Sequence, residues 1–330
     1  MRAFAVEAFG EAGSIREVER EEPQAGEVLV RVVAAGVNPV DWKSAAGYLK
    51  DWFEHRFPLI LGQDVSGVVE TVGPGVADFK VGDEVFGSHG KPFMGRGTLA
   101  EHVVASAAAL AKKPAGISHA EAAGIPLAGV TALMSVDALG DVRDQPVVVM
   151  GAAGGVGGFA VQIARARGAR VIGIARSNNH EYLRGLGVDE LVDYAATDVS
   201  AAVRSAHPDG IAAIIHLAGD AEELGPVVSL VRDGGTVVSP AGAAPIDSRG
   251  IQWGMFGAEV TRERLNQLLE MAQKGDLKLP PTRAYEFDDS SGALQESAGG
   301  HVRGKLVVRL VAAETAAKPT ASHEGPAAKG

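Results

Sequence analysis

The sequence predicts an α/β protein in which a β-rich N-terminal part is followed by a doubly wound parallel sheet. Short apolar runs separated by turn residues fill the chain before Ser118, and beyond it apolar runs alternate with helical patterns. The stretch "VVVMGAAGGVGGFAVQIARARGARVIGIARS" (Val147–Ser177) joins two apolar runs through a glycine-rich turn and one helical pattern. This arrangement is a βαβ unit, the building block of a parallel sheet.

The N-terminal part is predicted to form a small β-barrel or sandwich. The segment "GPGVADFKVGDEVFG" (Gly73–Gly87) indicates this, because Gly-Pro-Gly and Gly-Asp turn signals separate its apolar runs. The strands expected in this part are Met1–Glu7, Ile15–Glu21, Glu27–Val37, Val65–Val72, Glu84–Gly87 and Thr98–Ala105.

From Ser118 the pattern changes to alternating helices and strands. Ser118 fits a helix N-cap and Glu121 stands three residues later, as in a capping box. The strands expected beyond this point are Val147–Met150, Arg170–Ala175, Glu190–Val192, Ala212–Leu217, Thr236–Ser239, Tyr285–Phe287 and Lys305–Leu310. The expected helices are Val156–Arg167, His180–Leu186, Val199–Ala206, Ala221–Val231 and Thr261–Lys274.

Composition excludes several classes of protein. The 330 residues carry 31 Lys and Arg against 41 Asp and Glu, a net charge of −10, whereas a nucleic-acid-binding protein needs a basic face. There is no dense basic helix for an anionic membrane surface. The sequence has no cysteine, so disulfides and thiolate–zinc sites cannot form. The N-terminus lacks the long apolar run of a secretory signal, and we therefore expect a soluble cytoplasmic protein.

The glycine-rich turn predicts a dinucleotide site. Ala152-x-Gly154-x-x-Gly157 occupies the register of the dinucleotide-binding fingerprint, with Ala152 in place of the first glycine. It follows the run Val147–Met150 and opens a helix, so that backbone N–H groups and the helix N-terminus face a pyrophosphate. The alternative is a glycine turn that binds no ligand.

Arg176 indicates which dinucleotide is bound. An NAD site normally has Asp or Glu about 20 residues beyond the glycines, where it accepts a hydrogen bond from the ribose 2′-OH. Here the residue 19 positions after Gly157 is Arg176, and Ser177 follows it. Because an arginine and a hydroxyl favour a 2′-phosphate, the predicted cofactor is NADPH. The alternative is that Arg176 is a solvated surface residue.

Five motifs resemble those of the zinc-less quinone oxidoreductases of the medium-chain dehydrogenase/reductase superfamily, over nearly all of Met1–Leu310. The motifs are "AAGVNPVDWKSAAGYL" (Ala34–Leu49), "FPLILGQDVSGVVETVGPGVADFKVGDEVFG" (Phe57–Gly87), "IPLAGVTAL" (Ile125–Leu133), "GAAGGVG" (Gly151–Gly157) and "HVRGKLVVRL" (His301–Leu310). The resemblance implies a GroES-like catalytic domain at 1–118, to which 258–311 returns, and a Rossmann dinucleotide-binding domain at 119–257. Residues 312–330, rich in Ala, Pro, Lys and Gly, are expected to form a disordered tail.

The resemblance also bears on metal binding. Zinc-dependent relatives have a ligand cysteine at the position of Asn38 and a His-Glu pair at the positions of Gln63 and Asp64. Glutamine is a poor zinc ligand. His89 and His102 are expected to be ordinary core or surface residues. We therefore predict that the chain has no metal site.

The resemblance places further residues around the cofactor, which would lie in the cleft between the domains. It implies that Asn38 contacts the nicotinamide-ribose end, Thr131 approaches the carboxamide, Tyr194 lies near the 2′-phosphate and Lys305 lies near the cofactor. The expected cofactor-binding set is Asn38, Thr131, Ala153, Gly154, Gly155, Val156, Gly157, Arg176, Ser177, Tyr194, Ala218, Gly219, Pro240, Ala241, Gly242 and Lys305. Ordinary packing or solvation is the alternative for each, and Asn38 also suits a turn before Pro39.

The reaction that the resemblance implies is zinc-independent hydride transfer from NADPH to a quinone or an α,β-unsaturated carbonyl. Tyr48 resembles a family tyrosine that faces the substrate cleft, and it is the candidate catalytic donor to the acceptor oxygen. Tyr48, Trp52 and Phe53 are together candidates for a flat aromatic floor, or for ordinary packing under a loop. The alternative function is a catalytically silent NADPH-binding protein. The expected partners are a small-molecule substrate and a second copy in a homodimer, with no nucleic acid and no membrane.

Overall fold

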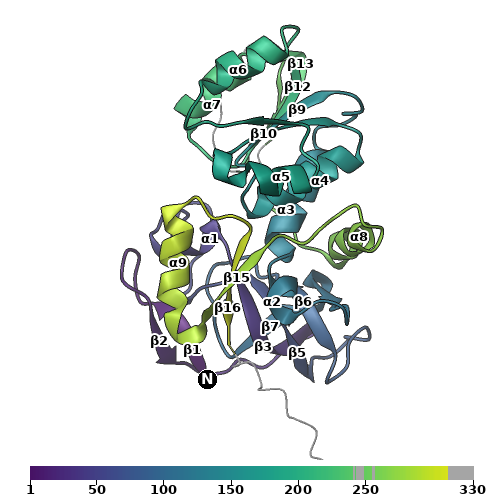
Figure 1. Ribbon diagram of the computed structural model, residues 1–330. Helices are drawn as coiled ribbons and strands as arrows, with labels where there is room; N and C mark the ends of the chain where they lie inside the picture. The colour runs from purple at the N-terminus through teal and green to yellow at the C-terminus, as the bar shows by residue number, and fades with distance from the viewer. Residues whose placement is uncertain (241, 243–248, 255–256, 311–330) are drawn as a thin grey trace, which may run out of the picture.

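The computed structural model describes residues 1–240, 242, 249–254 and 257–310. Ala241 and the tail expected at 312–330 therefore lie outside the described residues. Figure 1 shows a lower lobe that holds the N-terminal strands and an upper lobe in which helices flank a sheet. Helix α3 (Pro126–Asp137) lies at their junction. The fold class is the predicted α/β class, with a β-rich first lobe and a parallel sheet in the second.

The first lobe is built on a three-stranded and a seven-stranded sheet. Its strands β1 to β8 are Arg2–Val6, Ser14–Glu17, Glu27–Val37, Leu59–Ile60, Asp64–Val72, Glu84–Ser88, His102–Ser106 and Leu110–Lys112. Strand β3 is central, because it pairs antiparallel with β5, with β7 and with the late strand β16 (Lys305–Arg309). Alternate residues of β3, namely Val28, Val30 and Val32, are fully buried in the core of this lobe.

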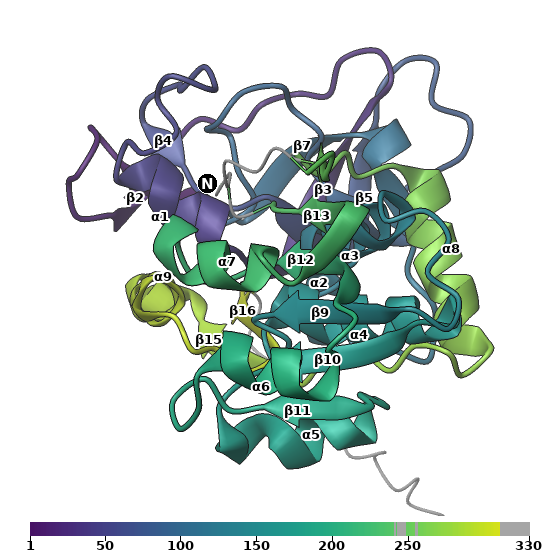
Figure 2. The same ribbon diagram turned by 90° about the horizontal axis from the view of Figure 1, so that it is seen from above.

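The second lobe contains a six-stranded parallel sheet in the order β11-β10-β9-β12-β13-β14. Strands β9 to β14 are Pro146–Met150, Arg170–Ile174, Glu190–Val192, Ile211–His216, Val231–Val238 and Gln252–Gly254. Figure 2 shows these strands in succession from β11 to β13. The chain builds one side of the sheet from β9 to β11 and then crosses to place β12 on the other side of β9. Open parallel sheets bind ligands beyond the carboxyl ends of the strands at such a reversal.

Helices cover both faces of this sheet. Helices α4 (Gly155–Ala166) and α5 (His180–Gly185) lie on one face, and α6 (Val199–Ala206) and α7 (Ala221–Val228) on the other (Figure 1). Along β9 the side chains alternate, so that Val147 and Val149 share a core with α4 whereas Val148 packs with α7. Burial on both faces explains why β9 is a continuous apolar run in the sequence. Among the described residues, no helix is both long and apolar enough to span a bilayer.

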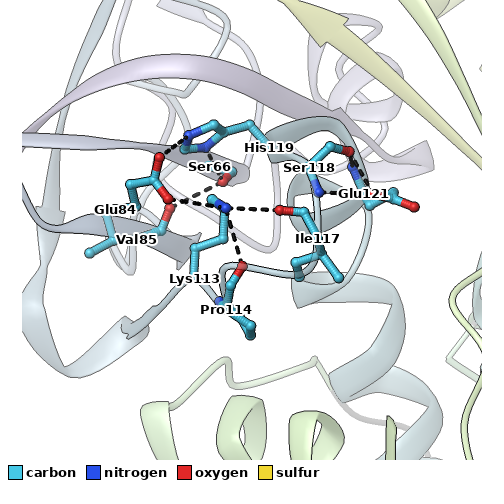
Figure 3. Close-up of polar contacts among 9 residues, drawn as sticks. All are labelled: Ser66, Glu84, Val85, Lys113, Pro114, Ile117, Ser118, His119 and Glu121. Carbon is cyan, nitrogen blue, oxygen red and sulfur yellow. Dashed lines mark hydrogen bonds and ion pairs between the residues drawn. The ribbon is translucent and has the colours of Figure 1, made fainter. Parts of the chain in front are cut away.

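A polar cluster fixes the segment that carries the chain from the first lobe to α2 (His119–Ala123) and α3. The ammonium of Lys113 lies 3.1 Å from Oε2 of Glu84, and Nε2 of His119 lies 3.4 Å from Oε1 of the same carboxylate (Figure 3). The capping box expected at the start of α2 is confirmed, since Oγ of Ser118 accepts the N–H of Glu121 at 3.2 Å. Strand β6, which carries Glu84, is thereby tied to the start of α2.

The chain after the second sheet returns to the first lobe. Helix α8 (Arg262–Gln273) packs on α3. Strands β15 (Thr282–Glu286) and β16 then pair with each other, and β16 pairs with β3. Helix α9 (Ser290–Gly299) packs against α1 (Pro39–Ala45). This return segment brings residues 300–305 to the glycine turn of the second lobe.

The strand pattern differs from expectation where loops compete for backbone partners. Residues 98–101 do not extend β7, because the N–H groups of Thr98 and Leu99 donate to the carbonyls of Gly62 and Leu61. Three short strands, β4, β8 and β14, are absent from the sequence-based pattern, since a strand of two or three residues gives no periodicity to recognise.

The helix pattern differs at proline and glycine positions. The helix expected after Ser118 is in fact two helices, because α2 ends at Gly124 and Pro126 begins α3. Proline suits the first position of a helix, where its missing N–H needs no partner. The same rule explains α1, which begins at Pro39 and for which Asn38, the residue that also suits a turn, is the N-cap. The described residues also form three short 3-10 turns, η1 (Ala107–Ala109), η2 (Ser177–Asn179) and η3 (Phe287–Asp289).

Candidate nucleotide and acceptor site

The glycine turn lies at the carboxyl end of β9, where the order of the parallel sheet reverses. Gly154 is the N-cap of α4, so Gly155, Val156 and Gly157 form its first turn. A Cβ at Gly157 would lie 2.2 Å from the carbonyl oxygen of Gly151, so only glycine fits there. A Cβ at Gly154 would meet nothing closer than 3.4 Å, which leaves space beside this residue. The turn therefore fits a pyrophosphate at the N-terminus of α4.

The return segment forms one wall of this turn. The N–H of Gly304 donates to the carbonyl of Ala153 at 3.0 Å, and Gly304 forms a β-bridge with Gly154. A Cβ at Gly155 would lie 2.7 Å from Cδ of Lys305, so the absence of a side chain at Gly155 leaves room for the lysine. The structure thus brings Lys305 next to the glycine turn, and both belong to the cofactor-binding set expected from the sequence.

Lys305 ends in a buried polar network. Its ammonium donates to Oδ1 of Asn38 at 2.6 Å and to the carbonyl of Val37 at 3.0 Å. The amide nitrogen of Asn38 donates to Oδ2 of Asp64 at 2.9 Å. The other oxygen of Asp64 accepts the N–H of Leu127, in the first turn of α3, at 2.9 Å. Asp64 is fully buried and therefore links α1, β16 and α3 within the protein interior.

Asp41 extends the network, since its Oδ2 accepts the N–H of Asn38 at 2.8 Å. Burial raises the pKa of Asp41 to about 7 and that of Asp64 to about 6. Burial also lowers the pKa of Lys305, although the two carboxylates oppose that shift. Because charged groups are costly to bury, the three groups gathered around Asn38 form a site that is sensitive to its protonation state.

Arg176 and Tyr194 lie at the ends of neighbouring strands, β10 and β11. The guanidinium carbon of Arg176 is 5.7 Å from the centroid of the Tyr194 ring. His301 of the return segment contacts both of them. The two residues expected near a 2′-phosphate are therefore brought together, at the sheet edge that carries the glycine turn.

Ser177 follows Arg176 in η2, and its backbone is already engaged. The N–H of Ser177 donates to Oδ2 of Asp193 at 3.0 Å. Hydrogen bonds from the backbone of Ala195 and from Ser177 hold the pKa of Asp193 below its ordinary value. A ligand at this strand end therefore meets the hydroxyl of Ser177 rather than its N–H.

The residues expected at the nicotinamide and acceptor end are more scattered. Thr131 is buried in α3, and its hydroxyl donates to the carbonyl of Leu127 at 2.6 Å. The Tyr48 side chain is 70% exposed, and its ring meets the edge of Trp42 at 5.9 Å between centroids. Trp52 is 68% exposed. The candidate aromatic floor is thus an exposed rim in this structure rather than a packed surface.

The remaining expected contacts follow later strands of the same sheet. Ala218 and Gly219 come after β12, and Pro240 and Gly242 come after β13. All four residues lie at the carboxyl edge, on the same side as the glycine turn, because the strands are parallel. Ala241 lies outside the described residues.

Within the described part of the chain, no three His, Asp or Glu side chains gather as a metal site.

A separate polar cluster resembles a catalytic triad in its residue types. Ser66, His119 and Glu84 have the order of a nucleophilic triad, with Ser66 Oγ 2.7 Å from His119 Nδ1 (Figure 3). Ser66 is fully buried and donates its hydroxyl proton to the carbonyl of Val85 at 3.1 Å. Since the hydroxyl has one proton, His119 donates to Ser66, and the serine is not activated.

Asp64, Asp41 and His301 belong to the site although the sequence does not point to them. The sequence marks Asp64 only as a position where zinc-dependent relatives have a ligand, whereas its buried place on β5 makes it the centre of the network. Asp41 sits at the third position of α1, which a proline-initiated helix would have revealed. His301 belongs to a recognised motif, but only the packing of the return segment places it beside Arg176.

The parallel sheet with its glycine turn, joined to a β-rich lobe, defines a two-domain dinucleotide-binding protein. One family model, described as alcohol dehydrogenase GroES-like domain, matches residues 24–115. A second, described as zinc-binding dehydrogenase, matches residues 186–308.

Individual proteins resemble nearly the whole chain. A chloroplastic quinone oxidoreductase of Triphysaria versicolor is 30% identical over 328 residues, covering 93% of this chain and 98% of the relative. A mitochondrial NAD(P)H oxidoreductase of Bos taurus is 30% identical over 329 residues, with coverage of 86% and 82%. The solved quinone oxidoreductase of Coxiella burnetii has a TM-score of 0.83 at 26% identity, with coverage of 94% and 99%. The chain belongs to the quinone oxidoreductase family of the medium-chain dehydrogenase/reductase superfamily, and it is a nicotinamide-dependent oxidoreductase.

Proposed function

We propose that the protein transfers hydride from NADPH to a quinone or to an α,β-unsaturated carbonyl, and that it does so without zinc. The observation that carries the choice of NADPH is the contact between Arg176 and Tyr194 at the ends of β10 and β11. An arginine at the end of the second strand favours a 2′-phosphate, where an NAD site has a carboxylate. Quinones stand first because similar proteins carry that name.

The residues of the chain supply positioning and charge. A bound nicotinamide supplies the hydride. The glycine turn and the N-terminus of α4 hold the pyrophosphate, and Arg176 with Ser177 holds the 2′-phosphate. Lys305 and Asn38, buried at the junction of the lobes, lie on the nicotinamide side of the turn in this proposal. The exposed hydroxyl of Tyr48 donates to the acceptor oxygen, where negative charge develops.

Zinc independence follows from the ligands that the chain offers. Asn38 and Gln63 stand where zinc-dependent relatives have ligands, and the chain has no cysteine. The side chain of Asn38 is occupied by Lys305 and Asp64, and that of Gln63 lies 3.3 Å from the sulfur of Met94. An ammonium therefore stands among the groups that a metal would need.

Steady-state oxidation of NADPH and NADH with a panel of quinones, enals and enones tests the proposal. We expect NADPH to be oxidised with at least one quinone and faster than NADH at equal concentration. Tight NADPH binding without turnover on any acceptor would favour the alternative, a silent NADPH-binding protein. Metal analysis of the active protein tests the zinc statement separately.

The proposal also takes the protein as a cytoplasmic homodimer that acts on a small molecule and binds neither nucleic acid nor membrane. Light scattering of the purified protein measures the mass in solution, and fractionation of the producing cells locates the protein. A monomer, or recovery with the membrane fraction, would contradict this part of the proposal.

A further inference from the structure

His301 bridges the two residues that flank the proposed 2′-phosphate position. Its Nε2 lies 3.2 Å from Nη2 of Arg176, and its Nδ1 lies 3.4 Å from the hydroxyl of Tyr194. The three residues come from the end of β10, the end of β11 and the loop before β16. The second lobe alone does not provide this arrangement, because the return segment contributes the histidine.

The hydrogen-bond partners fix the proton on the imidazole. A guanidinium has donors only, so Nε2 of His301 accepts from Arg176 and carries no proton. The ring proton of the neutral imidazole is therefore on Nδ1, where it faces the oxygen of Tyr194. Without a phosphate, this geometry holds His301 as a neutral acceptor.

The backbone at His301 is held in an uncommon conformation. Its φ is 60°, in the left-handed region that residues other than glycine rarely occupy. Such a conformation is unfavourable and persists where the surrounding structure imposes it, often at binding sites. Gly304 fixes the same loop from the other end through its hydrogen bond to Ala153.

A cavity of about 500 Å³ opens beside this histidine. It is lined from the second lobe by Asn178 and Asn179 and from the return segment by Arg283, Glu296, His301 and Arg303, among others. Arg283 is paired with Glu296 at 2.8 Å, whereas Arg303 lies over the ring of Tyr182. In the described part of the chain, no carboxylate forms an ion pair with Arg176 or Arg303. The cavity is therefore polar, large enough for part of a nucleotide, and supplied with positive charge.

Resting on the proposed use of NADPH, we propose that His301 is a specificity-determining residue that takes up a proton when the 2′-phosphate binds. Phosphate oxygens only accept hydrogen bonds, so the donors of Arg176 turn to the phosphate. The lone pair on Nε2 of His301 then faces a phosphate oxygen, and the two repel each other. A proton from solvent on Nε2 replaces this repulsion by a charge-assisted hydrogen bond.

The surrounding charges explain why the proton arrives only with the phosphate. Arg176 and Arg303 oppose a positive imidazole in the free protein, and Glu296 is already paired with Arg283. Across the strand end, the carboxylate of Asp193 accepts the N–H of Ser177. A bound phosphate dianion adds negative charge beside His301 and so favours the positive imidazole. NADH lacks the phosphate and leaves the charges around His301 unchanged.

Calorimetric titration with NADPH and with NADH, at pH 7 in buffers of different ionisation enthalpy, measures the protons taken up. We expect wild-type protein to take up protons with NADPH and none with NADH, since only NADPH brings the phosphate that stabilises a positive imidazole. The phosphate has a second pKa near 6 and can only release protons when it binds as the dianion, so uptake reports a protein group. In His301→Gln the uptake should disappear, with NADPH bound roughly tenfold more weakly and NADH unchanged.

His207→Gln provides the matched control. This histidine pairs with Glu190 at the opposite end of β11, and its variant should behave as wild type. If wild-type protein prefers NADPH but takes up no proton, the role of His301 is overturned and the proposed cofactor stands. The same holds if His301→Gln takes up as many protons as wild type. Equal wild-type affinities for NADPH and NADH would overturn the proposed cofactor as well.

Discussion

The ammonium of Lys305 lies 2.6 Å from Oδ1 of Asn38, although 267 residues separate them in the chain. Lys305 is in β16 of the return segment and Asn38 is the N-cap of α1. Both side chains are buried, so the contact fixes the last described strand against the first helix. Asp64 balances the lysine charge through Asn38, with its Oδ2 3.9 Å from the ammonium. The cost of burying this lysine is thereby offset by a hydrogen-bonded carboxylate.

Asp41→Asn should stabilise the protein at alkaline pH. Burial raises the pKa of Asp41 from 3.8 to about 7 in the folded state, which therefore binds more protons than the unfolded state between these values. Stability falls as the pH rises through this range, and the loss is complete above the folded pKa. The amide keeps an oxygen for the N–H of Asn38 and removes the charge. We expect the gain of the variant in free energy of unfolding to grow by about 2 kcal/mol between pH 5 and pH 8.

Urea unfolding at the two pH values measures this gain. Asp51→Asn, at an exposed carboxylate of the following loop, is the control and should show no such growth. A gain that is the same at both pH values would mean that Asp41 does not titrate in this range.

Arg176→Ala should weaken NADPH binding and leave NADH binding nearly unchanged. The substitution removes the charged partner of the 2′-phosphate, which is worth about 1.5–3 kcal/mol for a hydrogen bond to a charged group. Fluorescence titration with both cofactors measures the two dissociation constants. Arg184→Ala, at an exposed arginine of α5, should change neither. Equal losses for the two cofactors would show that Arg176 does not contact the phosphate.

Substitutions in the glycine turn should separate binding from folding. Gly154→Val should fold, because a Cβ there has no neighbour within 3.4 Å, yet lose cofactor binding by blocking the pyrophosphate. Gly157→Ala should instead lower the free energy of unfolding by about 1–3 kcal/mol, because its Cβ would lie 2.2 Å from a carbonyl oxygen. Thermal unfolding and NADPH titration of both variants check this. A Gly154→Val protein that binds NADPH normally would place the pyrophosphate elsewhere.

Tyr48→Phe should lower the turnover number and barely change NADPH affinity. Loss of one donor that acts in the transition state costs on the order of a hundredfold. We expect a smaller effect with quinones, since the phenolate product is stable and water protonates it after hydride transfer. An enone gives a more basic enolate, so its reduction should suffer more. Turnover that is unchanged with both acceptors would remove Tyr48 from the mechanism.

Elemental analysis should find no stoichiometric zinc in the purified, active protein. Asn38 and Gln63 are poor ligands, and the ammonium of Lys305 lies against Asn38, where it would repel a cation. One zinc per chain that survives dialysis, with activity lost to a chelator, would contradict this prediction.

Local signals in the sequence predict the parts of the fold that short stretches decide. The glycine turn, the capping box of Ser118 and Glu121, and strands such as Glu27–Val37 and Glu190–Val192 are found where the sequence places them. Each depends on side-chain periodicity or on backbone conformations within a few residues. Arg176 is recognisable for the same reason, because its distance from Gly157 is set by one βαβ unit.

Tertiary structure alone decides the contacts that make these residues a site. Nothing in the sequence links Asn38, Asp64 and Lys305 to one another. Only the pairing of β16 with β3 buries the three residues together. His301 reaches Arg176 because the return segment crosses the glycine turn. A hydrogen bond between residues more than a hundred positions apart leaves no periodicity in the chain. The pKa of Asp41, which depends on burial by several elements at once, is likewise a property of the assembled fold.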